Sequence, residues 1–244
     1  MKLLVIPARG GSKRIPRKNI KEFAGRPMIA WPIEAAKQSG VFDQIVVSTE
    51  DAQIAEVARE WGAEVPFLRR SELADDHAGT RAVMADAIAR LAVKEGVTCC
   101  LYATAPFVTA ADLRSATATI TEEPDVQSVI SVVRVDSSLL RSFTLDSGRL
   151  KRLLPSFAAT RSQDLPPVYR DAGQFYVASN ERWLGAQTPL AERALPYVLR
   201  DDLTVDIDTP EDWLRAEDLF LAWTNGGTRP RSAGTPSGQA GEDA

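Results

Sequence analysis

Cysteine and histidine are nearly absent from this chain, which has two cysteines and one histidine among 244 residues. Cys99 and Cys100 are neighbours, so their Cα atoms lie about 3.8 Å apart, which is too close for ordinary disulfide geometry. We therefore expect reduced, buried thiols and no redox or metal role for them. His77 is the one histidine, and we expect it to be a loop residue and not a catalytic base.

Long apolar runs and an excess of positive charge are also missing. No stretch reaches the roughly 18 apolar residues of a membrane span, and the apolar run at the N-terminus is too short for a signal peptide. The net charge of -4 and the isoelectric point near 5.2 provide no general positive field for nucleic acid or an anionic membrane. We expect a cytoplasmic protein that binds neither, with any anion site confined to a local cluster.

The composition, with 44% hydrophobic and 25% charged residues, allows one sizeable core. We expect one main domain over residues 1–224. Residues 225–244 are rich in Gly, Pro, Ser and Thr and have almost no large apolar side chains. Such a segment cannot bury enough apolar surface to fold, so we predict a disordered tail.

Strand and helix patterns alternate along the main domain. Apolar and β-branched runs predict strands at residues 3–6, 45–49, 65–68, 98–102, 128–134, 175–177 and 204–208. Helical spacing predicts helices from Pro27 to Gly40, over 51–61, 80–94 and 111–121, and after Thr209, which would be an N-cap. This alternation with short connections favours a doubly wound α/β sheet with helices on both faces.

Residues 135–167, called the arm below, interrupt this alternation. They read as short hairpin-like pieces around the turn sequence at residues 146–148. We expect the arm to leave the core and to cover a site or contact a partner subunit.

The sharpest local feature is the loop at residues 7–19 (PARGGSKRIPRKN), directly after the first predicted strand. Gly10 and Gly11 would let backbone N–H groups approach phosphate oxygens, while Arg9, Lys13 and Lys18 would neutralise their charge. Ligands of open α/β sheets bind at the carboxyl ends of the strands, where this loop lies. A solvated basic loop is the plainer alternative. The spacing matches neither the Walker A motif nor the dinucleotide motif, which disfavours a P-loop kinase or a dehydrogenase.

A second signal is the pair Asp206 and Asp208. Residues two apart on a strand point to the same face, so both carboxylates could share one Mg²⁺ with substrate phosphates and water. The alternative is that one of them only supports the start of the following helix.

Five collinear blocks resemble the sugar-acid cytidylyltransferases, the family that includes the CMP-N-acetylneuraminate synthetases. The resemblance covers about residues 1 to 220, through the blocks at residues 7–19, 47–51, 67–76, 103–107 and 205–212. Residues 161–165 followed by 171–176 resemble the pseudaminic acid branch, where sialic acid enzymes tend to carry an asparagine-glycine pair. The resemblance implies a Rossmann-like nucleotidyltransferase fold with a small hairpin subdomain for dimerisation, and hence a homodimer.

The resemblance also implies CTP and a nine-carbon acidic sugar as substrates, with CMP transferred to the anomeric hydroxyl of pseudaminic acid and pyrophosphate released. The implied catalytic residues are Lys18, Arg9 and Asp208. The implied nucleotide-binding residues are Ala8, Arg9, Gly10, Gly11, Ser12, Lys13, Asn19, Arg69, Asp76 and Ala78. The candidate sugar-binding residues are Tyr102, Thr104, Arg161, Gln163, Asp164, Gln174 and Tyr176, and Mg²⁺ would be held by Asp206 and Asp208.

Other functions remain open at this point. The same CTP loop would serve a synthetase for CMP-N-acetylneuraminate, CMP-legionaminate or CMP-3-deoxy-manno-octulosonate. A protein that binds nucleotide without catalysis on the same fold is an alternative from another class. It would be expected to lack Lys18 or the aspartate pair, and both are present here.

Overall fold

The computed structural model of the chain describes residues 1–74, 78–123, 125–185 and 194–226. Its centre is a six-stranded sheet with the strand order β10-β6-β9-β5-β1-β4. The sheet is parallel except for β9, which runs antiparallel to both β5 and β6. The strands are β1 (Lys2–Pro7), β4 (Gln44–Ser48), β5 (Val97–Leu101), β6 (Ser128–Val135), β9 (Val168–Ser179) and β10 (Leu195–Leu199). The predicted α/β fold is confirmed, with one antiparallel strand in the sheet.

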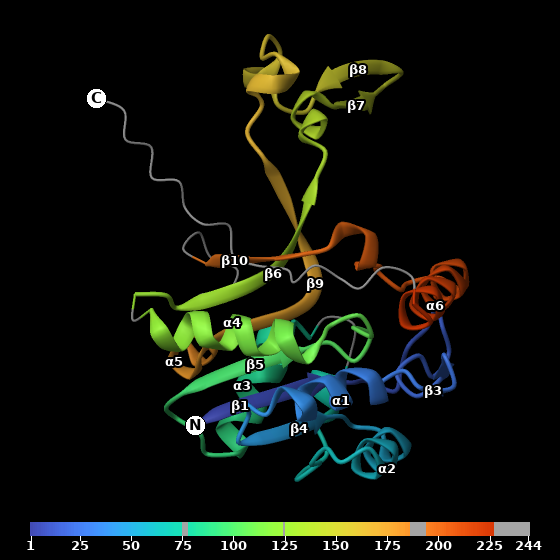
Figure 1. The fold of residues 1–244 in the computed structure, drawn as a ribbon, viewed down its shortest axis with the longest axis vertical. Helices are drawn as coiled ribbons and strands as arrows, with labels where there is room; N and C mark the ends of the chain where they lie inside the picture. Colours follow the sequence, from blue (N-terminus) through green and yellow to red (C-terminus); the bar gives the residue numbers. More distant parts are fainter. Residues whose placement is uncertain (75–77, 124, 186–193, 227–244) are drawn as a thin grey trace.

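Helices cover both faces of the sheet (Figure 1). One face carries α1 (Ala30–Ser39), α2 (Ala52–Glu60) and α4 (Ala110–Glu122), and the other carries α3 (Thr80–Arg90) and α5 (Asn180–Leu184). Leu4 and Ile6 of β1 pack into the first core, while Leu3 and Val5 pack into the second. Successive side chains of a strand point to opposite faces, so the unbroken apolar run of β1 fills two cores at once.

A third cluster lies beside the sheet, where α6 (Pro210–Thr224) packs on the hairpin of β2 (Glu22–Phe23) and β3 (Arg26–Pro27). The ring of Phe23 lies 5.4 Å from that of Trp213 and 5.5 Å from that of Phe220. Ile15 and Ile207 are buried in the same cluster. The cluster therefore brings the segment before α6 against the loop that follows β1.

Two predicted boundaries near the site are wrong. The first helix does not begin at Pro27, because residues 22–27 form the β2–β3 hairpin, with left-handed backbone at Ala24 and Gly25. Residues 204–208 form no strand, because this segment packs against the α6 cluster and Lys18 bonds to one of its carbonyl groups. The last strand is instead β10, which sequence patterns missed because Pro196 interrupts its apolar run.

Smaller differences concern element ends. Residues 65–68 contribute only an isolated bridge at Leu68, opposite Thr49. The helix predicted over residues 80–94 ends at Arg90, and Ala92 adopts a left-handed conformation that a helix cannot continue.

Several local predictions are confirmed. Thr209 is the N-cap of α6 and forms a reciprocal capping box with Asp212. Cys99 and Cys100 are buried and unpaired. No helix among the described residues is long and apolar enough to cross a membrane.

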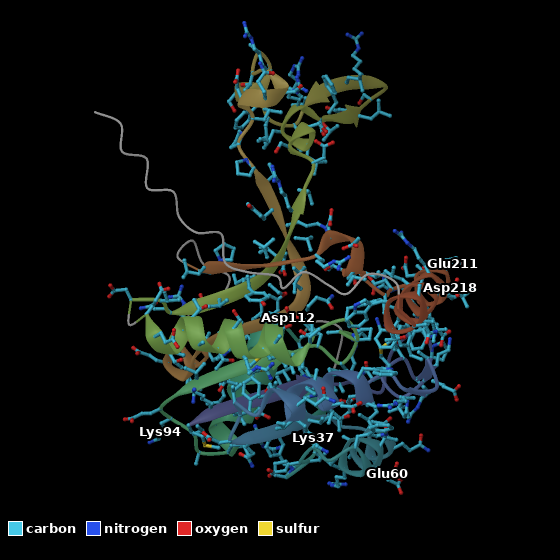
Figure 2. All side chains as sticks on the ribbon, in the orientation of Figure 1. Lys37, Glu60, Lys94, Asp112, Glu211 and Asp218 are labelled. Atoms are coloured by element: carbon cyan, nitrogen blue, oxygen red, sulfur yellow. The ribbon has the colours of Figure 1, made fainter. Side chains whose placement is uncertain are left out.

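The arm projects from the body of the molecule as a continuation of β6 and β9 (Figure 1). It contains the hairpin of β7 (Phe143–Asp146) and β8 (Arg149–Arg152), which confirms the turn predicted at residues 146–148. All residues of both strands are exposed, and side chains extend from the arm in every direction (Figure 2). Of the predicted tail, residues 227–244 lie outside the described residues, as do Asp76 and His77.

Candidate active site

A cavity of about 560 Å³ lies at the carboxyl ends of β1 and β5. Ten of the residues predicted from the sequence line it, and they come from the loop after β1, from the segments around α3 and β5, and from the segment before α6. These residues are Arg9, Ser12, Lys13, Lys18, Asn19, Arg69, Ala78, Tyr102, Thr104 and Asp208. Side chains more than 190 residues apart in sequence thus meet in a single polar cleft.

The loop at residues 7–19 is shaped by its own hydrogen bonds. The Ser12 amide donates to the Gly10 carbonyl at 3.0 Å, and the Asn19 side-chain amide donates to the Arg9 carbonyl at 2.9 Å. Arg17 adopts a left-handed backbone conformation with φ 58°. The loop is therefore folded back on itself, with its first and last residues fixed to each other.

Lys18 and Asp208 connect this loop to the segment before α6. The Lys18 ammonium donates to the Ile207 carbonyl at 2.7 Å and lies 3.5 Å from the Asp208 carboxylate. Arg14 lies 2.9 Å from the same carboxylate oxygen. Two cations and one anion thus meet at the cavity wall, where fixed cations can stabilise negative charge on a bound phosphate.

Arg69 forms the opposite side of the cavity. Its side chain is only 3% exposed and pairs with Glu50 at 2.6 Å. Its Nε has no hydrogen-bond partner among the described residues, although it is buried. Buried donors are rarely left unpaired, so this Nε lacks an acceptor that the described residues do not supply.

Tyr102 lines the cavity, and Tyr176 packs behind it without lining the cavity itself. The Tyr102 hydroxyl is 2.7 Å from that of Thr80, and its ring meets the ring of Tyr176 edge-on at 5.8 Å. The Tyr176 hydroxyl donates to Asp171 at 2.9 Å. Burial raises the pKa of Tyr102 to about 12, and burial with the neighbouring Tyr102 and Asp171 raises the pKa of Tyr176 further. Both phenols stay protonated near neutral pH and act as hydrogen-bond donors, not as bases.

Not all predicted site residues reach the cavity. Ala8 is fully buried in the core, and Gly10 and Gly11 do not line the wall. The Gly10 amide donates to the Glu50 carboxylate at 2.7 Å. Asp206 is exposed and does not line the cavity, so the argument that placed two aspartates side by side on a strand does not hold.

Gln174 lines a different cavity of about 550 Å³ between α4, β10 and α6, together with Tyr197. Tyr197 donates to Asp112, which is labelled on α4 in Figure 2. Arg161, Gln163 and Asp164 are exposed on the arm, which projects from the body (Figure 1), and none of them lines either cavity. Within one chain, the predicted sugar-binding residues are therefore divided among three places.

Six residues of the cavity wall were not among the predicted site residues, namely Pro7, Arg14, Leu73, Thr80, Val83 and Ala103. Arg14 lies inside the cationic loop, where its charge could have suggested the role. Thr80 and Val83 belong to the first turns of α3, and no local pattern distinguishes them from ordinary helix residues.

The residues that line the cavity fit a magnesium site with few protein ligands. Among the described residues, no group of three or more acidic, histidine or cysteine side chains could enclose a metal ion. Mg²⁺ often takes one or two protein carboxylates and completes its shell with substrate phosphates and water. Asp208, at the cavity wall, satisfies that requirement.

A family model described as Cytidylyltransferase matches residues 3–217 of the chain. The chain belongs to this cytidylyltransferase family. Relatives within the family act on different sugar acids, according to their names. The chain is 38% identical over 222 residues to the pseudaminic acid cytidylyltransferase of Campylobacter jejuni, covering 89% of this chain and 95% of that one. It is 34% identical to the CMP-N,N'-diacetyllegionaminic acid synthase of Legionella pneumophila, with 89% and 95% covered.

Solved structures show the same cytidylyltransferase fold. A CMP:2-keto-3-deoxy-manno-octonic acid synthetase complexed with CTP matches with a TM-score of 0.69 and 17% identity, covering 90% of this chain and 98% of that one. At this identity the likeness establishes the Rossmann-like nucleotidyltransferase fold and not the substrate.

Proposed function

We propose that this enzyme transfers CMP from CTP to the anomeric hydroxyl of pseudaminic acid, a nine-carbon acidic sugar, and releases pyrophosphate. The observation that carries the proposal is the polar cavity in which the loop cations, Arg69 and Asp208 meet. The similarity to a named pseudaminic acid cytidylyltransferase over almost the whole chain supports the choice of sugar.

The geometry suits an in-line displacement at the α-phosphorus with no covalent enzyme intermediate. Lys18 is held by the Ile207 carbonyl beside Asp208, so its ammonium can stay in place while charge grows on the transferred phosphoryl group. Arg9 and Lys13, in the same cavity wall, would bind the departing pyrophosphate, and Ser12 and Asn19 would orient the nucleotide. Most of the rate enhancement comes from positioning and charge neutralisation.

Asp208 would hold Mg²⁺ together with the phosphates of CTP. Asp206 is exposed and outside the cavity, so we assign it no contact with the ion. When bound, the ion supplies charge neutralisation and orientation of the phosphates. Without it, the Asp208 carboxylate is neutralised by Arg14 and Lys18.

The sugar acid would enter from the side of Tyr102 and Thr104, which line the cavity. Both hydroxyls can donate to or accept from the polyol, and Tyr176 supports Tyr102 from behind. The Gln174 carbonyl accepts from the Tyr102 amide, but its side chain lines the other cavity, so we assign it no contact with the sugar in the same chain.

We further propose a homodimer in which the arm of one copy completes the sugar subsite of the other. Arg161, Gln163 and Asp164 do not reach the cavity of their own chain. Leu145 and Leu150 on the arm are 74% and 71% exposed, more than an isolated hairpin can keep in water without cost. A second copy would bury these leucines and receive the polar residues of the arm.

We place the enzyme in the cytoplasm. The support is its two adjacent free thiols, which are expected in a reducing compartment.

The experiment that tests the function measures pyrophosphate release from CTP with a panel of pseudaminic, N-acetylneuraminic, legionaminic and 3-deoxy-manno-octulosonic acids. Mass analysis identifies the product. We expect the highest kcat/KM with pseudaminic acid. A preference for legionaminic acid would favour the alternative suggested by the Legionella relative, and no release with any acid would overturn the proposal.

A further inference from the structure

The residues directly after β4 contact the cationic loop without lining the cavity. Glu50 and Asp51 follow the carboxyl end of β4, next to the carboxyl end of β1 in the parallel pair. Neither residue is among the predicted site residues, yet both carboxylates accept hydrogen bonds from the loop of residues 7–19.

Glu50 bridges two parts of the site with its two oxygens. Oε1 accepts from the Gly10 amide at 2.7 Å, and Oε2 accepts from the Arg69 guanidinium at 2.6 Å. Both contacts have at least one charged partner, which makes them stronger than neutral hydrogen bonds. The side chain of Glu50 is 23% exposed, so water screens these contacts only partly.

Asp51 fixes the next part of the same loop. It caps α2 by accepting from the amides of Gln53 and Ile54, and it accepts from the Arg17 guanidinium at 2.5 Å. A Cβ on Gly10 would lie 2.4 Å from its carboxylate. A larger residue at position 10 would therefore displace the Asp51 side chain from the contacts that it makes with Arg17 and with the start of α2.

We infer that Glu50 is a positioning residue for CTP: it ties the phosphate-binding loop to Arg69 and so fixes the spacing between the phosphate and base subsites. Because Glu50 accepts from the Arg69 guanidinium, it limits the positions that this cavity-lining side chain can take beside a nucleotide. This inference rests on the proposed use of CTP, with Arg69 bordering the cytosine.

Glu50→Gln tests the bridge with the smallest change of shape. Its single amide oxygen can accept from Gly10 or from Arg69 but not from both, and its NH₂ group faces the other donor. We expect KM and Kd for CTP to rise about ten-fold or more, with KM for the sugar acid unchanged. A role in overall folding alone would lower the melting temperature and the active fraction without changing KM for CTP.

Asp43→Asn is the matched control. Like Glu50, Asp43 accepts a hydrogen bond from a backbone amide, in this case that of Lys2 in β1 at 2.7 Å. Asp43 lies at the other end of β4, away from the cavity. It should leave KM for CTP unchanged. If Glu50→Gln does not fold, Glu50→Asp keeps the charge, shortens the reach and should raise KM for CTP in the same way.

Calorimetric titration with CTP alone separates this inference from the proposed function. If wild-type protein binds CTP but turns over no sugar acid, the proposed function is contradicted. The role of Glu50 can then still be tested by comparing the Kd for CTP of wild type and Glu50→Gln. A Glu50→Gln variant with wild-type affinity for CTP, or with tighter binding, would overturn the inference. Tighter binding would mean that the carboxylate only repels the triphosphate.

Discussion

Two regions of the molecule can be compared, the cavity in the body and the arm that projects from it. They differ in how many of their side chains find partners within the same chain. The cavity wall is made by segments from four parts of the sequence, and its charged groups already have partners, as Lys18 and Asp208 show. The arm exposes its leucines, and its polar residues Arg161, Gln163 and Asp164 line neither of the two cavities described above. The comparison suggests that the nucleotide half of the site is formed within one chain and that the sugar half needs a second copy.

Removing the ammonium of Lys18 should have the largest effect. Lys18→Ala is expected to lower kcat by about a thousand-fold, because it removes a fixed positive charge next to the reacting phosphate. Lys94→Ala, far from the cavity at the edge of the molecule in Figure 2, should leave kcat unchanged. Steady-state release of pyrophosphate measures both, and a small effect of Lys18→Ala would contradict its role.

The two aspartates before α6 should differ from each other. Asp208→Asn is expected to lower kcat about a hundred-fold or more at saturating Mg²⁺, because its carboxylate is at the cavity wall. Asp206→Asn should have a smaller effect, because Asp206 does not line the cavity. Titrating activity with Mg²⁺ for both variants checks the order. Equal losses would show that the pair acts as one unit.

Disrupting the arm should affect the sugar and not the nucleotide. The double variant Leu145→Asp and Leu150→Asp is expected to yield monomers that still bind CTP but have lost turnover. Leu214→Asp is a matched control, because Leu214 is 63% exposed on α6 in the body. Light scattering and CTP titration together measure the outcome.

Mixing two inactive variants sharpens this prediction. Lys18→Ala supplies an intact arm, and Arg161→Ala supplies an intact cavity, so a mixed dimer contains one complete site. We expect the mixture to regain activity that neither variant has alone. No recovery after subunit exchange would show that each site uses its own arm.

The ion pair between Arg17 and Asp51 should have the smallest effect. Hydrogen bonding from Arg17 lowers the pKa of Asp51 below its usual value. The pair therefore stabilises the fold above the unfolded pKa of about 3.9, and this contribution is lost as the pH falls further through the lowered folded pKa. Asp51→Asn should lower the free energy of unfolding by about 1 kcal/mol at pH 7, and the difference should shrink as the pH falls through the lowered folded pKa.

Denaturant unfolding of wild type and Asp51→Asn between pH 7 and pH 2 checks this dependence. Asp146→Asn, in the exposed turn of the arm, is the control and should follow wild type at every pH. A difference for Asp51→Asn that persists at pH 2 would indicate that the effect is one of helix capping alone.

Sequence patterns predicted the cationic loop well, because glycines and basic residues follow directly after a buried strand. Asp208 was found through a strand that does not exist, since tertiary packing against α6 decides the conformation of residues 204–208. The side of the sheet that Gln174 faces was not predictable. A β-bulge opposite residues 130–132, with φ 60° at Gly173, breaks the alternation of side chains along β9.

Contacts between distant segments account for the rest. Thr80 bonds to Tyr102, 22 residues away, and Glu50 bonds to Gly10 and Arg69, which are 40 and 19 residues away. No local spacing marks either Thr80 or Glu50 as part of the site. In the proposed homodimer, the arm would meet the cavity of a second copy, and no pattern within one chain can specify that contact.

A crystal structure of the chain with CTP and Mg²⁺ tests the central claim most directly. We predict the triphosphate against Lys18 and the loop of residues 7–19, with the cytosine toward Arg69 and the ion next to Asp208. A nucleotide bound in the cavity between α4 and β10, or anywhere away from that loop, would contradict the account.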